Sequence, residues 1–190
     1  MIPSTREIQS AIYGAWLLFK LDPRGLDFFE DSLPAFWRSF FAAVIVAPGF
    51  AILQVIDPSE GERSASLLAI LLVELIAYVI VWVSFPLALH SLCRFIDREA
   101  KFVKAVIALN WSVVIQIALI LPVHLVAAGG LLPTGLATLA ILAALIVTLV
   151  YEGFVASRAL EISPRLAALV VGLDVAISLV VRAVVSFLLA

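Results

Sequence analysis

The sequence is poor in charged residues, cysteine and histidine, and these shortages exclude several kinds of site. Only 14% of its 190 residues are charged, whereas about a quarter are charged in an average soluble domain. A single cysteine excludes an intramolecular disulfide and any metal site built from several cysteines. His90 and His124 fall near the ends of successive predicted spans, at opposite membrane faces, so they cannot readily share a metal ion. We therefore expect neither a metal ion nor another cofactor.

Catalytic and nucleic-acid-binding patterns are missing as well. The sequence contains no HExxH zinc motif, no glycine-rich phosphate loop and no nucleophile elbow. It also lacks a basic stripe that would hold phosphates, and its formal net charge is -2. These absences predict a protein that is not an enzyme and that does not bind nucleic acid.

Hydrophobic residues are abundant instead. They make up 64% of the chain, and the mean hydropathy is +1.19, which is typical of an integral membrane protein. We expect an all-α membrane protein in which five transmembrane helices follow an N-terminal amphipathic helix. The predicted spans are 34–56, 67–92, 105–128, 136–156 and 166–190.

The first 33 residues form a separate predicted segment. Residues 4–7 have the sequence of a capping box, which opens a helix whose apolar residues recur at helical spacing. This helix is too short to cross a bilayer, so we expect it to lie flat in the headgroup region. The predicted interfacial anchors are Trp16, Phe19, Phe28, Phe29, Trp37 and Arg38.

The lysines and arginines are distributed unevenly around the predicted spans. Ten of the 12 fall in the N-terminal segment, the first turn of the first span or the loops 93–104 and 158–165. Because cytoplasmic loops carry an excess of Lys and Arg, the N-terminus is predicted to be cytoplasmic and the C-terminus to lie outside. The short loops are typical of a protein of the bacterial inner membrane.

The predicted spans contain a small group of polar residues. It comprises Glu74, Asn110, Gln116, Asp174, Ser178 and Arg182. Asp174, Ser178 and Arg182 follow one another at every fourth position, so they form one polar stripe along the last helix. A different face of that helix carries Ala168, Gly172 and Ala176, small residues that allow close helix packing in lipid.

Two interpretations of this polar group remain open. In the first, the charges pair to fix helix register: Glu74 with Arg182 near the outer surface, and Asn110 or Gln116 beside Asp174. In the second, the group relays protons or cations, or binds a headgroup or solute. Each charge at mid-membrane costs about 2.5–3.5 kcal/mol on insertion scales, so either interpretation requires partners.

The charged loops also suggest an internal repeat. Arg94 and Asp97 match Arg158 and Glu161 at an offset of 64 residues, and the same offset relates Asn110 to Asp174. We predict that the second and third spans form a hairpin similar to the one formed by the fourth and fifth.

The layout of an N-terminal segment with prolines and phenylalanines, here residues 20–29, before five closely spaced spans resembles the Yip-domain family. The Asp-Leu-Tyr-Gly-Pro motif of its eukaryotic branch is absent, and residues 21–25 only echo it. The resemblance implies a non-enzymatic role in membrane organisation or trafficking, with the lipid bilayer, other membrane subunits or further copies of the chain as partners. The alternative function is a small transporter or an ion- or proton-conducting subunit that uses Asp174, Glu74 and Arg182.

Overall fold

The computed structural model describes residues 2–56 and 66–189, and within these residues every regular element is helical. The elements are α1 (Thr5–Phe19), η1 (Pro23–Phe28), α2 (Leu33–Ser39), α3 (Phe41–Ile56), α4 (Leu67–Phe95), η2 (Glu99–Lys101), α5 (Phe102–Ala128), α6 (Thr134–Leu160) and α7 (Pro164–Leu189). The loop predicted over residues 57–66 lies outside the described residues, except for Ser66.

Five helical segments are long and apolar enough to cross a membrane, which confirms the predicted all-α class. They are Leu33–Ile56, Leu67–Phe95, Glu99–Ala128, Thr134–Leu160 and Pro164–Leu189. α4 and α6 extend beyond their predicted ends at 92 and 156 because Arg94 and Arg158 occupy their last turns, where a positive charge stabilises the helix dipole.

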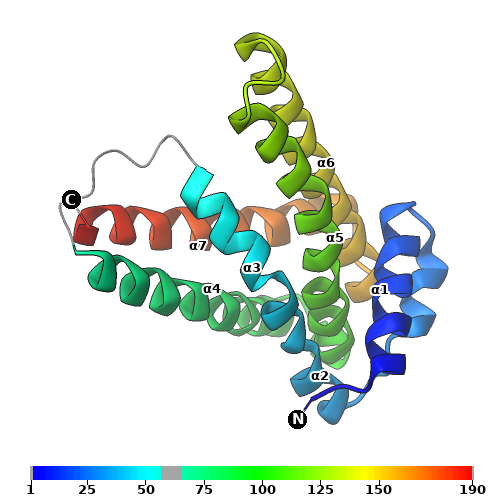
Figure 1. Cartoon of the computed structure of the whole chain (residues 1–190). Helices are drawn as coiled ribbons and strands as arrows, with labels where there is room; N and C mark the ends of the chain where they lie inside the picture. Colours follow the sequence, from blue (N-terminus) through cyan, green and yellow to red (C-terminus); the bar gives the residue numbers. More distant parts are fainter. Residues whose placement is uncertain (1, 57–65, 190) are drawn as a thin grey trace.

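The long helices pack in two pairs that run in different directions. α5 lies along α6 and α4 lies along α7, while α3 crosses between the pairs and packs on α5 (Figure 1). α4 and α5 therefore meet at their charged turn and diverge from there, and α6 and α7 do the same (Figure 1). The predicted hairpins are open V shapes whose arms pack on the other hairpin.

α4 and α6 end in the same backbone motif, 64 residues apart. Asp97 and Glu161 both have a φ of 54°, in the left-handed region. The N–H of the following residue then donates to a carbonyl five residues earlier, that of Cys93 or Ser157, as in a Schellman cap. α1 ends in the same way at Leu21. The cap therefore recurs at the predicted repeat without being unique to it, and the repeat stays a prediction.

The predicted capping box near the N-terminus is confirmed. Ser4 Oγ accepts from the Glu7 N–H, and Glu7 Oε2 accepts from the Ser4 N–H at 2.7 Å, which completes a capping box. Ser32 Oγ accepts from the Ala35 N–H and caps α2, with Pro34 in the first turn.

The position of α1 differs from the prediction. Its inner face, which carries Ala11, Ala15 and Leu18, is buried in the core and packs on α5 and α6 instead of facing lipid. η1 folds back on α1 at two glycines, where a Cβ on Gly14 would come within 2.8 Å of the Gly25 carbonyl oxygen. Because both residues lack a side chain, the two backbones touch, and the N-terminal segment becomes part of the helical core.

The first predicted span is broken between α2 and α3, at Phe40. Just before the break, Ser39 Oγ donates to the Phe36 carbonyl at 2.7 Å and accepts from Asn110 Nδ2 at 2.9 Å. α3 continues without a break through Pro48 and Gly49. A Cβ on Gly49 would lie 2.7 Å from an Ile117 methyl, so glycine permits the close approach of α3 to α5.

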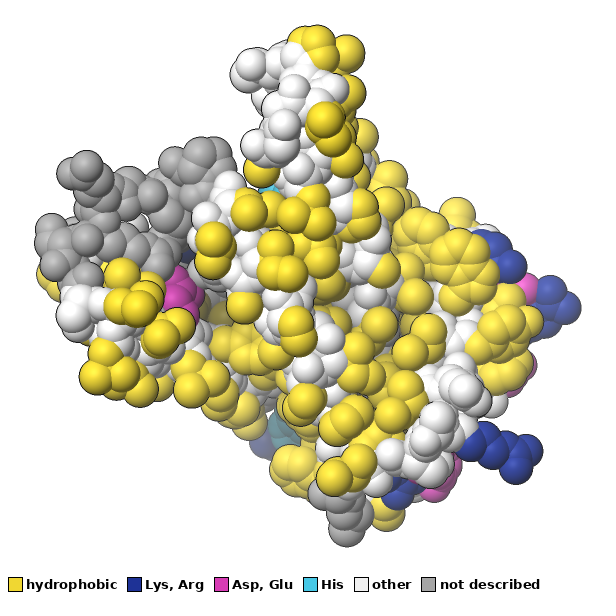
Figure 2. All heavy atoms as spheres, in the orientation of Figure 1, with side chains coloured by type: hydrophobic (Ala, Val, Ile, Leu, Met, Phe, Trp, Pro, Cys, Tyr) yellow, Lys and Arg dark blue, Asp and Glu magenta, His cyan; other side chains and the backbone are white. Residues whose placement is uncertain are grey.

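The surface of the molecule is divided between apolar and charged regions. On the face in Figure 2, hydrophobic side chains cover the long helices, while basic and acidic side chains gather around α1, η1 and α2. Exposed large residues such as Leu72, Leu139 and Phe187 lie on α4, α6 and α7. An apolar surface of this extent is what a bilayer would cover.

Candidate functional site

A crevice of about 680 Å³ lies where the two helix pairs diverge. Residues of α3, α4, α5, α6 and α7 line it, so every long helix contributes to its walls. Most of these residues are apolar. Its position follows from the open V shape of the hairpins, which leaves space between the arms that α3 fills only in part.

All six polar residues predicted within the spans line this crevice. Glu74 comes from α4, and α5 and α7 supply the other five: Asn110, Gln116, Asp174, Ser178 and Arg182. Sequence reasoning missed four further polar residues of the lining, which are Gln54, Ser112, Thr148 and Glu152. The fold therefore gathers polar groups from distant parts of the chain into one mostly apolar crevice.

Two of the predicted polar residues are hydrogen-bonded to groups that the sequence did not suggest. Glu74 Oε2 accepts from Gln54 Nε2 on α3 at 2.8 Å. Asn110 Nδ2 donates to Ser39 Oγ, so this amide joins α5 to the end of α2 and not to Asp174. The pairing of Glu74 with Arg182 stays a prediction, and both residues have interaction partners.

Glu152 is the least expected group in the crevice. It is only 7% exposed, and its Oε1 atom is buried without a hydrogen-bond partner among the described residues. Buried polar atoms are nearly always paired, and one left unpaired costs about 1–3 kcal/mol or more when charged. Asp174 faces the same crevice, near enough for the two carboxylates to repel each other. No described residue forms a hydrogen bond or ion pair with Asp174.

Glu152 could not be singled out from the sequence, because a fourth span that ends at residue 156 leaves it only one turn from the helix end. α6 instead continues to Leu160, so Glu152 lies about 12 Å inside the helix at 1.5 Å per residue. A signal was available, since Thr148 and Glu152 are one helical turn apart and share a face. In the structure both line the crevice and both are buried.

Aromatic side chains form part of the crevice wall. Phe50 packs on Tyr78 with ring centroids 5.4 Å apart, and Tyr78 packs on Trp82 at 6.1 Å. The Tyr78 hydroxyl donates to the Ala43 carbonyl at 2.6 Å, which fixes its ring. These rings, all within the lining, give one wall of the crevice a π-rich surface.

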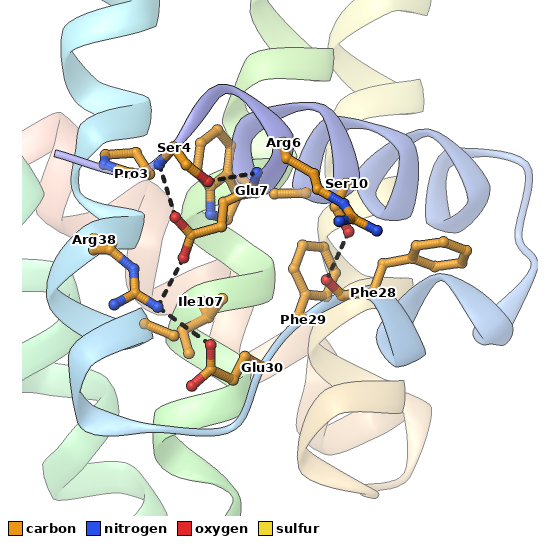
Figure 3. A pocket seen from close by; sticks show the side chains of 13 residues that line it. Pro3, Ser4, Arg6, Glu7, Ser10, Phe28, Phe29, Glu30, Arg38 and Ile107 are labelled. Atoms are coloured by element: carbon orange, nitrogen blue, oxygen red, sulfur yellow. Dashed lines mark hydrogen bonds and ion pairs between the residues drawn. The ribbon is translucent and has the colours of Figure 1, made fainter.

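A second, smaller pocket of about 300 Å³ lies beside α1, η1 and α2 (Figure 3). Arg38 spans it, with its guanidinium 2.8 Å from Glu7 and 3.2 Å from Glu30 (Figure 3). The backbone N–H of Ser4 and the nearby Arg38 hold the pKa of Glu7 below its usual value. Because its charges already pair with one another, this pocket is the weaker candidate for binding a charged ligand.

The predicted interfacial anchors fall into two groups. Trp16, Phe28 and Trp37 are exposed, and Trp37 has 65% of its surface free. The other three are held by protein contacts instead of facing an interface. Phe29 is buried, Phe19 packs edge-on against Tyr151 and Arg38 forms the two ion pairs.

The small-residue face of α7 is largely uncovered by the described chain. Ala168, Gly172 and Ala176 are exposed, and a Cβ added to Gly172 would meet no atom within 4 Å. α7 packs on the rest of the chain through other residues, including Val170 and Val185. Any close packing on the predicted face would thus involve another molecule.

The acidic residues of the crevice do not resemble a metal centre. Within the described ranges, no group of three or more His, Cys, Asp or Glu side chains could hold a metal ion. Two converging carboxyls, Glu152 and Asp174, in apolar surroundings can instead hold a proton or counter a single positive charge.

Comparisons with known proteins do not assign the chain to a family. No protein-family model matches it, and neither a curated protein nor a solved structure gives a match. The resemblance to the Yip-domain family stays a prediction based on layout, so any function must be argued from the site itself.

Proposed function

We propose that this chain is a multi-pass integral membrane protein that binds a small solute or amphiphile in the crevice and acts as a small transporter or solute-binding subunit. The observation that carries the proposal is the buried, unpartnered Glu152 carboxyl at a crevice that also contains Asp174. Ionisable groups retained inside a membrane commonly mark solute or proton pathways.

The dimensions and chemistry of the crevice support this proposal. Ligand sites usually measure about 300–1,000 Å³, with mostly apolar walls and a few convergent polar groups. The crevice, at about 680 Å³, falls within that range and has that composition. A purely structural charge cluster would leave each buried carboxyl paired, whereas Glu152 Oε1 has no partner among the described residues.

The membrane setting is part of the same proposal. The charged turns 93–104 and 158–165 would lie in the cytoplasm with the N-terminal segment, and the C-terminus would lie outside. A bacterial inner membrane remains our proposed location, and the role is non-enzymatic.

A scaffold or trafficking-like protein is the second candidate function, and one observation favours it. The exposed small-residue face of α7 at Ala168, Gly172 and Ala176 suits close packing against a partner helix in lipid. The two functions are compatible in one molecule, since this face and the crevice use different residues of α7.

Access from water to the crevice tests the proposed function. In a Cys93→Ala background, Ser178→Cys places a thiol in the crevice, and Val180→Cys places one on the exposed face of the same helix, outside the crevice lining. In lipid vesicles we expect a charged, water-soluble thiosulfonate reagent to modify position 178 faster than position 180, which lipid would cover. Equal protection of both positions would indicate a closed core and favour the scaffold.

A further inference from the structure

The ionisable groups of the crevice make it acidic. Its lining contains three carboxyls, from Glu74, Glu152 and Asp174, and one guanidinium, from Arg182. Glu74 and Arg182 already have partners. The two groups left to meet a ligand, Glu152 and Asp174, are both carboxyls, so the crevice favours positive charge and disfavours an anion.

The walls specify the rest of the ligand. Apolar residues dominate the lining, and the rings of Phe50, Tyr78 and Trp82 form a connected aromatic patch within it. A small inorganic cation would leave these walls without a contact, and the described residues provide no cluster of metal ligands. A molecule with an apolar body would use the walls, and the faces of Trp and Tyr rings attract cations.

We propose, on the basis of the function proposed above, that the crevice binds an apolar organic cation with one ammonium or phosphonium centre. The charged centre lies beside Glu152 and Asp174, and the hydrophobic body packs on the aromatic wall of Tyr78 and Trp82. The ligand supplies the positive partner that Glu152 Oε1 otherwise lacks within the described chain.

Two probes of nearly identical shape and opposite charge test the ligand class. Tetraphenylphosphonium and tetraphenylborate are dialysed to equilibrium against the purified full chain in neutral detergent, with protein-free micelles as the blank. We expect saturable binding of the phosphonium with an affinity at least about tenfold above that of the borate, as desolvated charge pairs typically provide.

Substitutions locate the binding site. Glu152→Gln and Asp174→Asn keep side-chain size and remove the charge, and each should weaken phosphonium binding about tenfold or more. Trp82→Leu should weaken it severalfold through loss of a ring. Asp27→Asn is the matched control, because Asp27 is an exposed carboxyl far outside the crevice lining and its loss should leave binding unchanged.

Each outcome decides between the two proposals. Saturable borate binding equal to or stronger than phosphonium binding would overturn the cation inference and leave a ligand-binding crevice in place. Phosphonium binding that survives both carboxyl substitutions would place the probe elsewhere and also overturn the inference. If neither probe binds above the micelle blank and position 178 is also closed to the thiosulfonate, the proposed function fails as well. The comparison of probes on the unsubstituted chain remains decisive even if Glu152→Gln does not fold.

Discussion

The two ends of the helix bundle are built differently. At the end near the charged turns, α1 and α2 pack on the start of α5 and the end of α6, and residues 105–112 are all buried. Toward the other end, α4 and α7 separate from α5 and α6, and the crevice opens between them. Each span has a most apolar stretch, and the buried share of that stretch is 39% in the span that contains α5 but only 6% in α4.

The contrast shows that polar groups serve different purposes at the two ends. At the closed end, the hydrogen bonds of Tyr151 to Ala15 and of Asn110 to Ser39 join elements far apart in sequence. In the crevice, Glu152 is buried without such a bond among the described residues. Stability is concentrated at the closed end, and the energetic cost of a buried carboxyl without a hydrogen-bond partner is carried at the open one.

The largest effect on stability is expected from adding one methyl group at the closed end. Gly25→Ala would push a Cβ into the Gly14 carbonyl oxygen, with Leu18 on the other side. Overpacking of this kind costs about 1–3 kcal/mol, and a backbone atom cannot move aside as a side chain can. We expect a clear drop in the melting temperature in detergent.

Gly135→Ala is the control for that substitution, because a Cβ there meets no atom within 4 Å. Its melting temperature should be unchanged or slightly higher, since alanine favours a helix. Equal stability of the two variants would show that η1 does not pack on α1 as described.

The second prediction concerns the open end, where the change should be stabilising. Glu152→Leu replaces a buried carboxyl with an apolar side chain of similar size, so we expect a gain of about 1–3 kcal/mol in the free energy of unfolding. The same variant should lose phosphonium binding. A loss of stability, measured by denaturant titration in mixed micelles, would mean that the carboxyl has a stabilising partner.

Two tyrosines, one at each end, allow the energetic value of a hydrogen bond at the two ends to be compared directly. Tyr151 and Tyr78 each donate to a backbone carbonyl, at 2.8 Å and 2.6 Å, but Tyr151 is 1% exposed and Tyr78 lines the crevice. Tyr151→Phe removes a buried hydrogen bond between α6 and α1 and should cost about 1 kcal/mol. Tyr78→Phe should cost less, because water in the crevice can replace the lost donor. Thermal unfolding of both variants measures the two costs. A larger drop in melting temperature for Tyr78→Phe than for Tyr151→Phe would contradict this prediction.

The smallest effect is expected at the exposed turns. Lys101 Nζ lies 2.6 Å from Glu161 Oε1, and this hydrogen bond and charge hold the pKa of Glu161 below its usual 4.5. A lowered pKa in the folded state means that the pair stabilises the fold above pH 4.5 and loses that contribution as the pH falls further.

Glu161→Gln should therefore be slightly less stable than the unsubstituted chain at neutral pH, and the two stabilities should converge under acid conditions. High salt should also reduce the difference, because the pair is exposed. A difference in stability that grows as the pH falls would contradict a stabilising pair between Lys101 and Glu161.

Sequence periodicity was sufficient for the helical fold, because each apolar run is long enough to form a span whatever its neighbours are. It also identified six crevice residues, since polar groups in apolar helices need a shared polar environment. It did not reveal Glu152, whose depth depends on where α6 ends. Nor did it predict the position of α1, because an apolar helix face fits lipid and protein equally well, and only the Gly14–Gly25 contact and the Tyr151 hydrogen bond decide between them.

The adjacency of Tyr151 and Glu152 has a practical consequence for work on this protein. Neighbouring residues of a helix point about 100° apart, so one residue holds α1 while the next faces the crevice. Rotation of α6 cannot move one without the other. Deleting the N-terminal segment would release Tyr151 and alter the orientation of Glu152. Ligand screens should therefore use the chain with α1 intact.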